Sequence, residues 1–266
     1  MLMKFRKSYL SLACIFVFVS AVPVHASFTA IIIGAAAEWA TKKALDYAWD
    51  YFYGPDNSND SKTPDERANE GDPIAQYNLG LMYYSGYMVE KNPYRAISLW
   101  QSSAEKGNTD SQCKLGCMYY EGDTVNQNHE AALKYFLMAA KNGDSTGQYN
   151  AGVMYFNGTG VKKNITEALK LFRKSAENGE VTAQYILGCI YHDGEEVTRD
   201  SFEAFKWYRM AAEHGDAESQ CNLGSMYYNG EGVERDESEA LVWWSKAANQ
   251  GNKEAIYNIE LVLSDN

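Results

Sequence analysis

The side chains that could perform chemistry are few in this chain and widely separated. Cys113 and Cys117 lie four residues apart, but no nearby pair of histidines could complete a tetrahedral zinc site with them. The chain contains no nucleophile elbow, P-loop, dinucleotide fingerprint or zinc-binding helix motif. We therefore expect no catalytic residue, no metal site and no cofactor in this protein, and we do not expect it to be an enzyme.

A repeat organises the rest of the chain. A glycine recurs at a fixed interval of 36 residues, at Gly71, Gly107, Gly143, Gly179, Gly215 and Gly251. Self-similarity at a period of 20–50 residues is typical of a solenoid, in which each unit contacts mainly its neighbours. With the glycine as position 1, five full repeats cover residues 71–250, and a terminal helix covers 251–266. We predict an all-α fold, an α-solenoid of antiparallel helix pairs.

Each repeat carries start and stop signals for two helices. Position 2 is Asp, Asn or Glu, mostly residues that cap a helix N-terminus, and a glycine such as Gly86 ends the first helix. The second helix begins after an Asn or Asp such as Asn92. Capping boxes are predicted in the last three copies, at Glu167, Glu203 and Glu239. A glycine inside the first helix, such as Gly80, indicates close backbone approach by a neighbouring helix.

These repeats resemble the Sel1-like repeat, a relative of the tetratricopeptide repeat. Their shared pattern is A-x-x-G-[DN]-x-x-A-Q-Y-x-L-G-x-M-Y-x-x-G-x-G-V-x-x-D-x-x-E-A-x-x-W-x-x-K-A-A, over residues 63–266. The resemblance implies a right-handed superhelix with the first helices on its concave side. It also implies a scaffold or adaptor that binds another protein in that groove. Because secreted bacterial members include proteins that neutralise toxic effectors, a periplasmic immunity-type protein is the alternative. An enzyme acting on cell-wall material is the second alternative.

One face of the first helices varies from copy to copy, at positions 4, 8, 11 and 15. We expect this face to be solvent-exposed and to line the groove, because packing does not dictate its residues. Asparagine could bond both N–H and C=O of an extended peptide, and tyrosine offers rigid contact area. The predicted partner-binding residues are Asn78, Lys114, Asn150, Ile186, Asn222 and Asn258 at position 8, with Tyr77, Tyr149 and Tyr185 at position 7. The alternative is that the tyrosines belong to the core between helices.

The repeat period also ranks the possible disulfides. Cys189 and Cys221 lie in adjacent first helices, one turn apart, and could form a disulfide. Pairs two or more repeats apart exceed the Cα distance of about 7 Å that a disulfide tolerates. In cysteine-rich members of the resembled family, disulfides link the two helices of one repeat. Alanine occupies the corresponding second-helix positions in this chain.

The first 26 residues have the pattern of a secretory signal peptide. A basic start is followed by an apolar run and by Val24-His25-Ala26, small residues suited to cleavage before Ser27. We expect an exported protein, periplasmic or secreted, with no transmembrane segment in the mature chain. The pattern of residues 27–54 predicts an amphipathic helix that either caps the first repeat or plugs the groove. Residues 55–62 have the composition of a polar linker.

The chain is acidic, with 24 basic and 35 acidic residues and a net charge of −11. A nucleic-acid surface needs clustered lysine and arginine, so this charge argues against nucleic-acid binding. A basic protein partner fits the charge better.

Overall fold

The computed structural model describes residues 62–122 and 124–264. These residues form twelve helices and no strand, which confirms the predicted all-α class. The predicted signal peptide, the 27–54 helix and nearly all of the 55–62 linker lie outside the described residues. None of the described helices combines the length and the apolar character needed to cross a membrane.

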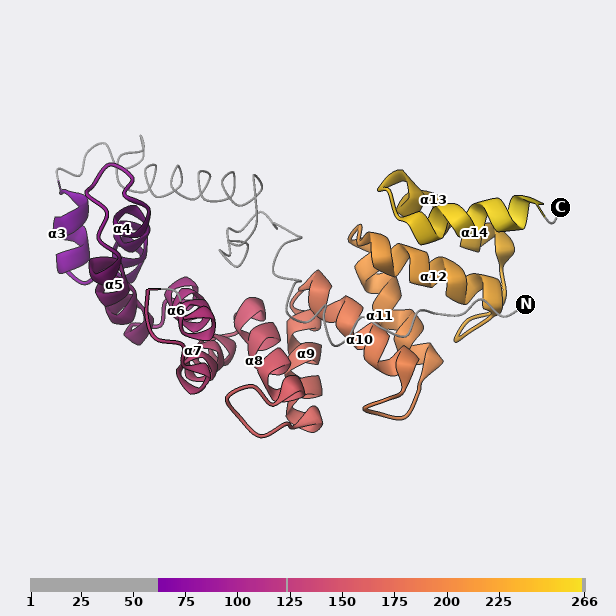
Figure 1. Ribbon diagram of the computed structural model, residues 1–266, viewed down its shortest axis with the longest axis horizontal. Coiled ribbons are helices and arrows are strands. Elements are labelled where there is room, and N and C mark those ends of the chain that lie inside the picture. The colour runs from indigo at the N-terminus through magenta and orange to yellow at the C-terminus, as the bar shows by residue number, and fades with distance from the viewer. Residues whose placement is uncertain (1–61, 123, 265–266) are drawn as a thin grey trace. The chain divides into compact units, whose positions relative to one another are not determined.

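The helices alternate in the order that the repeat predicts (Figure 1). The first helices of the repeats are α4 (Pro73–Ser85), α6 (Thr109–Glu121), α8 (Ser145–Asn157), α10 (Val181–Asp193), α12 (Ala217–Asn229) and α14 (Lys253–Ser264). The second helices are α5 (Pro93–Glu105), α7 (His129–Lys141), α9 (Ile165–Glu177), α11 (Ser201–Glu213) and α13 (Glu237–Asn249). A short helix, α3 (Pro64–Asn69), precedes the first repeat.

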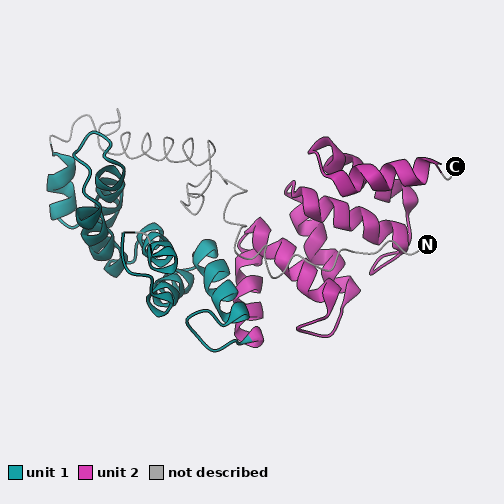
Figure 2. Cartoon of the chain, in the orientation of Figure 1, with its two compact units in different colours: residues 1–164 teal, residues 165–266 magenta. Residues whose placement is uncertain are grey.

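The chain divides into two compact units, Met1–Asn164 and Ile165–Asn266 (Figure 2). In the described part of the first unit, each helix from α3 to α8 packs on the next one along the chain. The same holds for α9 to α14 in the second unit. Packing between sequence neighbours is the defining property of a solenoid, so the predicted architecture is confirmed within each unit.

The glycine inside the first helix allows close packing of an aromatic ring. A Cβ atom added to Gly80 would lie 2.4 Å from Nε1 of Trp100, on the paired helix α5. At Gly224 the added atom would lie 2.6 Å from Cδ1 of Trp244 on α13. Both distances are far inside van der Waals contact, so only glycine fits there. The close approach is confirmed, but the approaching group is a side chain rather than the predicted neighbouring backbone.

The predicted helix ends are largely confirmed. The side chain of Asp72 caps α4 by accepting from the Ile74 and Ala75 N–H groups, and Gly86 ends this helix with φ 77°. The predicted capping box at α11 was wrong. Asp200 accepts from the Glu203 N–H at 3.0 Å, but the Glu203 carboxylate accepts from the Trp207 indole at 3.1 Å instead of returning to the cap backbone.

At α13 the cap bond runs only from the Glu239 N–H to Asp236. A complete capping box forms at α3 instead, between Thr63 and Glu66.

A buried glutamine at position 6 ties each repeat to the one before it. Its amide N–H donates to an alanine carbonyl near the end of the preceding second helix. The five bonds are Gln76 to Ala68 (3.0 Å), Gln112 to Ala104 (2.8 Å), Gln148 to Ala140 (3.4 Å), Gln184 to Ala176 (2.9 Å) and Gln220 to Ala212 (3.1 Å). These carbonyls lie in the last turn of a helix, and each also accepts from the N–H of the repeat glycine, for example from Gly107 to Ala104 at 3.0 Å. The glutamine therefore supplies a second donor to a carbonyl that already has one.

The same glutamine accepts a hydrogen bond from position 36, thirty residues further on. The observed donors are Lys106 to Gln76 (3.4 Å), Asn142 to Gln112 (3.3 Å), His214 to Gln184 (3.2 Å) and Gln250 to Gln220 (2.8 Å). Nδ1 of His214 also lies 2.9 Å from the Met210 carbonyl oxygen, so we assign its proton to Nδ1. Gln76, Gln112, Gln184 and Gln220 therefore each link three successive helices. We call this arrangement the glutamine staple.

Replacing one glutamine of the staple by an apolar residue of similar size should destabilise the protein. In Gln112→Leu, the Ala104 carbonyl keeps its bond from the Gly107 N–H but loses the glutamine donor, and the Asn142 amide loses its glutamine acceptor. The two lost hydrogen bonds should together cost about 1–3 kcal/mol in the free energy of unfolding. Urea denaturation measures the loss. The matched control, Gln127→Leu, removes an exposed bond and should cost less than about 0.5 kcal/mol. Equal losses for the two variants would contradict the staple.

A strained loop residue offers a stabilising change. Thr124 has φ 65°, in the left-handed region that β-branched residues avoid. Of the equivalent positions, one carries the unbranched Met88 at 59° and two carry Gly160 at 68° and Gly232 at 70°. We expect Thr124→Gly to raise the melting temperature and to increase the free energy of unfolding by about 1 kcal/mol. The reverse change, Gly232→Thr, should lower it, because the added Cβ would lie 2.1 Å from the Ser201 carbonyl oxygen. A lower melting temperature for Thr124→Gly would show that the strain is absent.

Candidate functional site

Position 8 of the first helices is not the exposed stripe that its variability predicts. The exposed fractions are 0% for Asn78, 9% for Lys114, 2% for Asn150, 3% for Ile186 and 4% for Asn258. Only Asn222 is partly exposed. The prediction of solvent exposure was therefore wrong for position 8, whereas position 15 of the same face is exposed in all five repeats. Its physical cause is visible in α8, where buried residues occupy every face of the helix from Thr146 to Met154.

Two of these buried asparagines lack hydrogen-bond partners. The amide nitrogen and oxygen of Asn78 and of Asn150 are inaccessible to solvent and make no hydrogen bond. A buried polar group without a partner costs about 1–3 kcal/mol, so most native proteins avoid it. Both residues occupy the same repeat position, on α4 and α8 of the first unit, two repeats apart. The side-chain amides of Asn78 and Asn150 thus each keep an N–H donor and a C=O acceptor that no neighbouring group uses.

The tyrosines at position 7 belong mainly to the core between helices. Tyr77 and Tyr149 are buried, and Tyr185 is partly exposed. The indole of Trp100 donates to the Tyr77 carbonyl at 3.1 Å, and the Tyr77 ring packs in a cluster with Leu81 and Trp100. For Tyr77 and Tyr149 the structure therefore supports the alternative, a place in the core. Whether any predicted contact residue binds a partner stays a prediction.

Two carboxylates come together at the N-termini of α6 and α8 in the first unit. The thiol of Cys113 donates to Oδ1 of Asp144 at 3.2 Å, which joins α6 to the cap of α8. Asp110 lies in the first turn of α6. Burial, and then the charge of Asp144, raise the pKa of Asp110 to about 6. The buried Tyr77 hydroxyl makes no hydrogen bond, and its pKa is raised by burial and then by the charge of Asp110.

The second unit has an equivalent group of residues in which the carboxylate accepts a hydrogen bond. Glu218 takes the place of Asp110 in the repeat, and Asn252 takes the place of Asp144. The amide of Asn252 donates to Oε1 of Glu218 at 3.1 Å. Burial and then the charges of Asp216 and Glu254 raise the pKa of Glu218, while the hydrogen bond from Asn252 lowers it. The pKa values of Asp110 and Glu218 are therefore both raised, but Asn252 donates to Glu218 whereas Asp144 repels Asp110.

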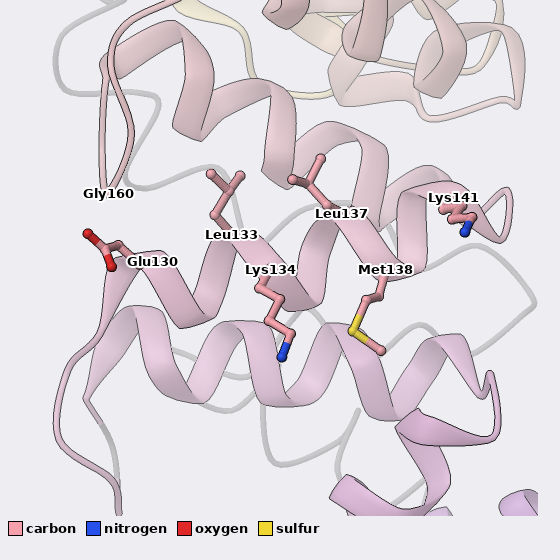
Figure 3. Close-up of a pocket in the computed structure, with 7 residues that line it drawn as sticks. All are labelled: Glu130, Leu133, Lys134, Leu137, Met138, Lys141 and Gly160. Carbon is pink, nitrogen blue, oxygen red and sulfur yellow. The ribbon is translucent and has the colours of Figure 1, made fainter.

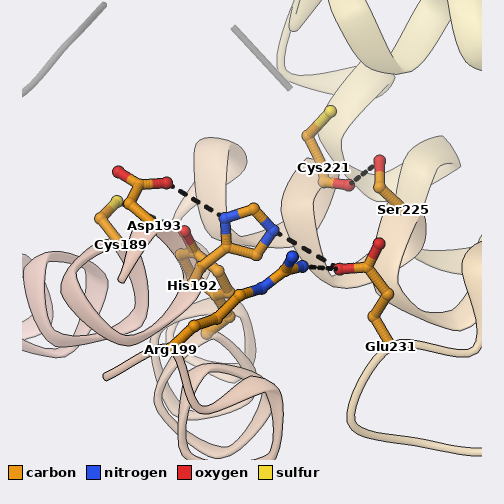
Figure 4. Close-up of polar contacts among 8 residues, drawn as sticks. Cys189, His192, Asp193, Arg199, Cys221, Ser225 and Glu231 are labelled. Atoms are coloured by element: carbon orange, nitrogen blue, oxygen red, sulfur yellow. Dashed lines mark hydrogen bonds and ion pairs between the residues drawn. The ribbon is translucent and has the colours of Figure 1, made fainter. Parts of the chain in front are cut away.

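His192 joins two repeats of the second unit (Figure 4). Its Nδ1 lies 3.1 Å from Oδ1 of Asp193, and its Nε2 lies 3.6 Å from Oε2 of Glu231. Glu231, in the loop after α12, also pairs with Arg199 at 2.7 Å. The imidazole packs against the Tyr208 ring, with 6.3 Å between ring centroids. This arrangement supports a structural role for His192, in the place of the aromatic residue that other repeats have.

Cys189 and Cys221 lie on α10 and α12, and Figure 4 shows them as separate thiols. The Tyr208 hydroxyl donates to the Cys189 sulfur at 3.4 Å. Burial raises the pKa of both thiols to about 12, so they are poor nucleophiles at neutral pH. The disulfide between them stays a prediction. Within the described residues, no group of three or more His, Cys, Asp or Glu side chains could hold a metal ion.

A cavity of about 450 Å³ lies along the outer surface of α7 (Figure 3). Leu133, Leu137 and Met138 form its apolar part. The other lining residues are Glu130, Lys134, Lys141 and Gly160. One carboxylate and two lysines provide neither a nucleophile with its base nor a carboxylate pair, so this cavity offers no recognisable catalytic arrangement.

Comparison with known proteins places the chain in a family. The family model described as Sel1 repeat matches five consecutive segments, residues 73–108, 109–144, 145–180, 181–216 and 217–252. This chain belongs to the Sel1 repeat family. None of the curated protein sequences compared with it matches significantly.

Two solved structures of Sel1 repeat proteins are similar to this chain. The first is c5321, a protective antigen of uropathogenic Escherichia coli, with 32% identity and a TM-score of 0.74 over 85% of this chain and 49% of that one. This chain thus spans about half the length of c5321. The second is a Sel1 repeat protein from Oxalobacter formigenes, with 30% identity and a TM-score of 0.66 over 82% and 86% of the two chains. Sel1 repeat proteins are generally protein-interaction scaffolds and typically non-catalytic.

Removing the Asp110 charge should stabilise the protein in a pH-dependent way. The folded pKa of about 6 lies above the ordinary value of 3.8, so the ionised group destabilises the fold above pH 6. That penalty disappears as the pH falls from 6 to 4, where the folded state binds the proton. We expect Asp110→Asn to increase the free energy of unfolding by about 2–3 kcal/mol at pH 7 and by almost nothing at pH 4. Urea denaturation at both pH values tests this, and a gain independent of pH would contradict it.

Proposed function

We propose that this protein is an exported, non-catalytic scaffold that binds an extended segment of another protein along its first helices. Membership of the Sel1 repeat family supports the general role. The export pattern of residues 1–26 supports action in the periplasm or outside the cell.

The unpartnered amides of Asn78 and Asn150 carry this proposal. A peptide backbone presents an N–H and a C=O together, and an asparagine amide can bond to both. Because both amides are buried, a partner reaches them only after local opening of the first-helix face. Binding that requires such a change is slower than docking on a preformed surface, so we expect an association rate below about 10⁵ M⁻¹s⁻¹.

The test compares the mature chain with the double variant Asn78→Leu/Asn150→Leu in a crosslinking capture from bacterial periplasm and culture medium. Leucine has the same number and branching of side-chain heavy atoms as asparagine and leaves no unpartnered polar group, so the removed polar penalty should offset the cost of its larger methyl groups. We expect a captured protein that the double variant loses. The control Asn157→Leu changes an exposed asparagine of α8 and should retain the capture.

Capture of the same protein by the double variant would overturn the role of the amides. Loss of the capture in the Asn157→Leu control would show that the effect is not specific to position 8.

A further inference from the structure

The cavity on α7 is lined by a stripe of residues along one side of that helix. The α7 residues that line it recur at helical spacing from Glu130 to Lys141 (Figure 3), and we call them the α7 stripe. Leu137 and Met138 are partly exposed, and Lys134 and Lys141 are exposed. None of the ion pairs within residues 62–122 and 124–264 uses either lysine. The α7 stripe therefore combines apolar surface with two positive charges that make no ion pair.

The repeat shows that the fold does not require this combination. Position 31 is Leu137 in α7, whereas the other second helices carry polar residues there, namely Gln101, Arg173, Arg209 and Ser245. Position 35 is Lys141 in α7, whereas the other copies carry Glu105, Glu177, Glu213 and Asn249. Since the other repeats pack with polar or acidic residues at these positions, packing does not explain the apolar and basic character of α7. Exposed apolar surface rimmed by charged residues is typical of a protein contact site.

The outer face of α14 has the complementary character. Ile256, Tyr257 and Leu263 are large apolar residues with exposed fractions of 40%, 60% and 64%. Ile256, Glu260 and Leu263 are spaced by four and three residues, so they lie on one face of the helix, and Glu260 is exposed. We call these four residues the α14 face. Glu260 occupies position 10, which is glycine in the five preceding first helices. The α14 face therefore presents apolar surface around a carboxylate.

We propose that the α14 face of one molecule docks on the α7 stripe of a second copy of this chain. The two helices are of nearly equal length, 13 residues for α7 and 12 for α14. When they run parallel with Lys253 beside Glu130, Glu260 lies between the two lysines of the stripe, because both helices rise equally per residue. In the antiparallel direction Lys253 would instead meet Lys141. The charges therefore favour the parallel direction.

This contact joins two different surfaces, so it is head-to-tail and leaves one surface of each kind free on every pair. Association can therefore continue beyond a dimer. A contact between two helices is small, so we expect it to be weak, with a Kd of about 10–100 μM. The inference does not use the amides of Asn78 and Asn150, and it is independent of the proposed scaffold function.

Sedimentation velocity of the mature chain at low salt, from about 1 to 500 μM, tests the contact. The average mass should rise with concentration, and Lys141→Glu and Glu260→Lys should each weaken association at least about fivefold. The charge swap Lys141→Glu/Glu260→Lys should associate at least about threefold more tightly than either single variant, because the two charges are again opposite. Lys141→Glu introduces the residue that three other repeats carry at position 35, so the fold should tolerate it.

The apolar part of the contact has its own variant. Leu137→Gln introduces the residue that the first repeat carries at position 31, and it should weaken association at least about threefold. The matched controls are Lys174→Glu on α9 and Glu254→Lys on another side of α14. They change the net charge as much as the single variants do and should leave association within about twofold.

A chain that stays monomeric at about 500 μM would overturn the proposal. A charge swap that associates no better than the single variants would also overturn it. Equal losses in the controls would reduce the effect to net charge. Loss with Glu260→Lys but not with Lys141→Glu would assign the contact to two α14 faces and contradict docking on α7.

Discussion

The buried amide of the position-6 glutamine is the interaction on which the rest of this structure depends. The last turn of each second helix has an alanine carbonyl that accepts from the backbone N–H of the repeat glycine. The glutamine adds a second donor to this carbonyl and receives a donor from the end of its own second helix, so it joins three helices. The identity of the donor matters little, since lysine, asparagine, histidine and glutamine all serve. The rigid backbone produced in this way holds the first helices in register within each unit.

That register explains why a single substitution changes the electrostatics of a repeat without changing its shape. Asp144 and Asn252 occupy the same position and cap the same kind of helix. One repels the acidic residue of the previous first helix and the other donates to it.

The helix boundaries and the close approach at position 10 could be predicted from sequence because they depend on local rules. Asp72 marks the start of α4 because its side chain caps the helix, and Gly86 marks its end because glycine readily adopts the left-handed conformation. The exposure of position 8 could not be predicted in this way. Variability at Asn78 and Lys114 was interpreted as exposure, but a first helix packs against several neighbours, and each repeat meets different ones. The staple had a sequence signal, since every residue at position 36, from Lys106 to Gln250, carries a side-chain N–H. That signal could not be interpreted from sequence alone, because the position-36 residue donates to a glutamine thirty residues earlier in the chain.

The most direct test of the account is to observe the side-chain amides of Asn78 and Asn150 by NMR, in the free protein and with its captured partner. If a peptide backbone binds them, both NH₂ resonances should shift and exchange more slowly with solvent in the complex, while the exposed Asn157 amide stays unchanged. Unchanged resonances at Asn78 and Asn150 in a saturated complex would contradict the claim that these buried amides recognise the partner.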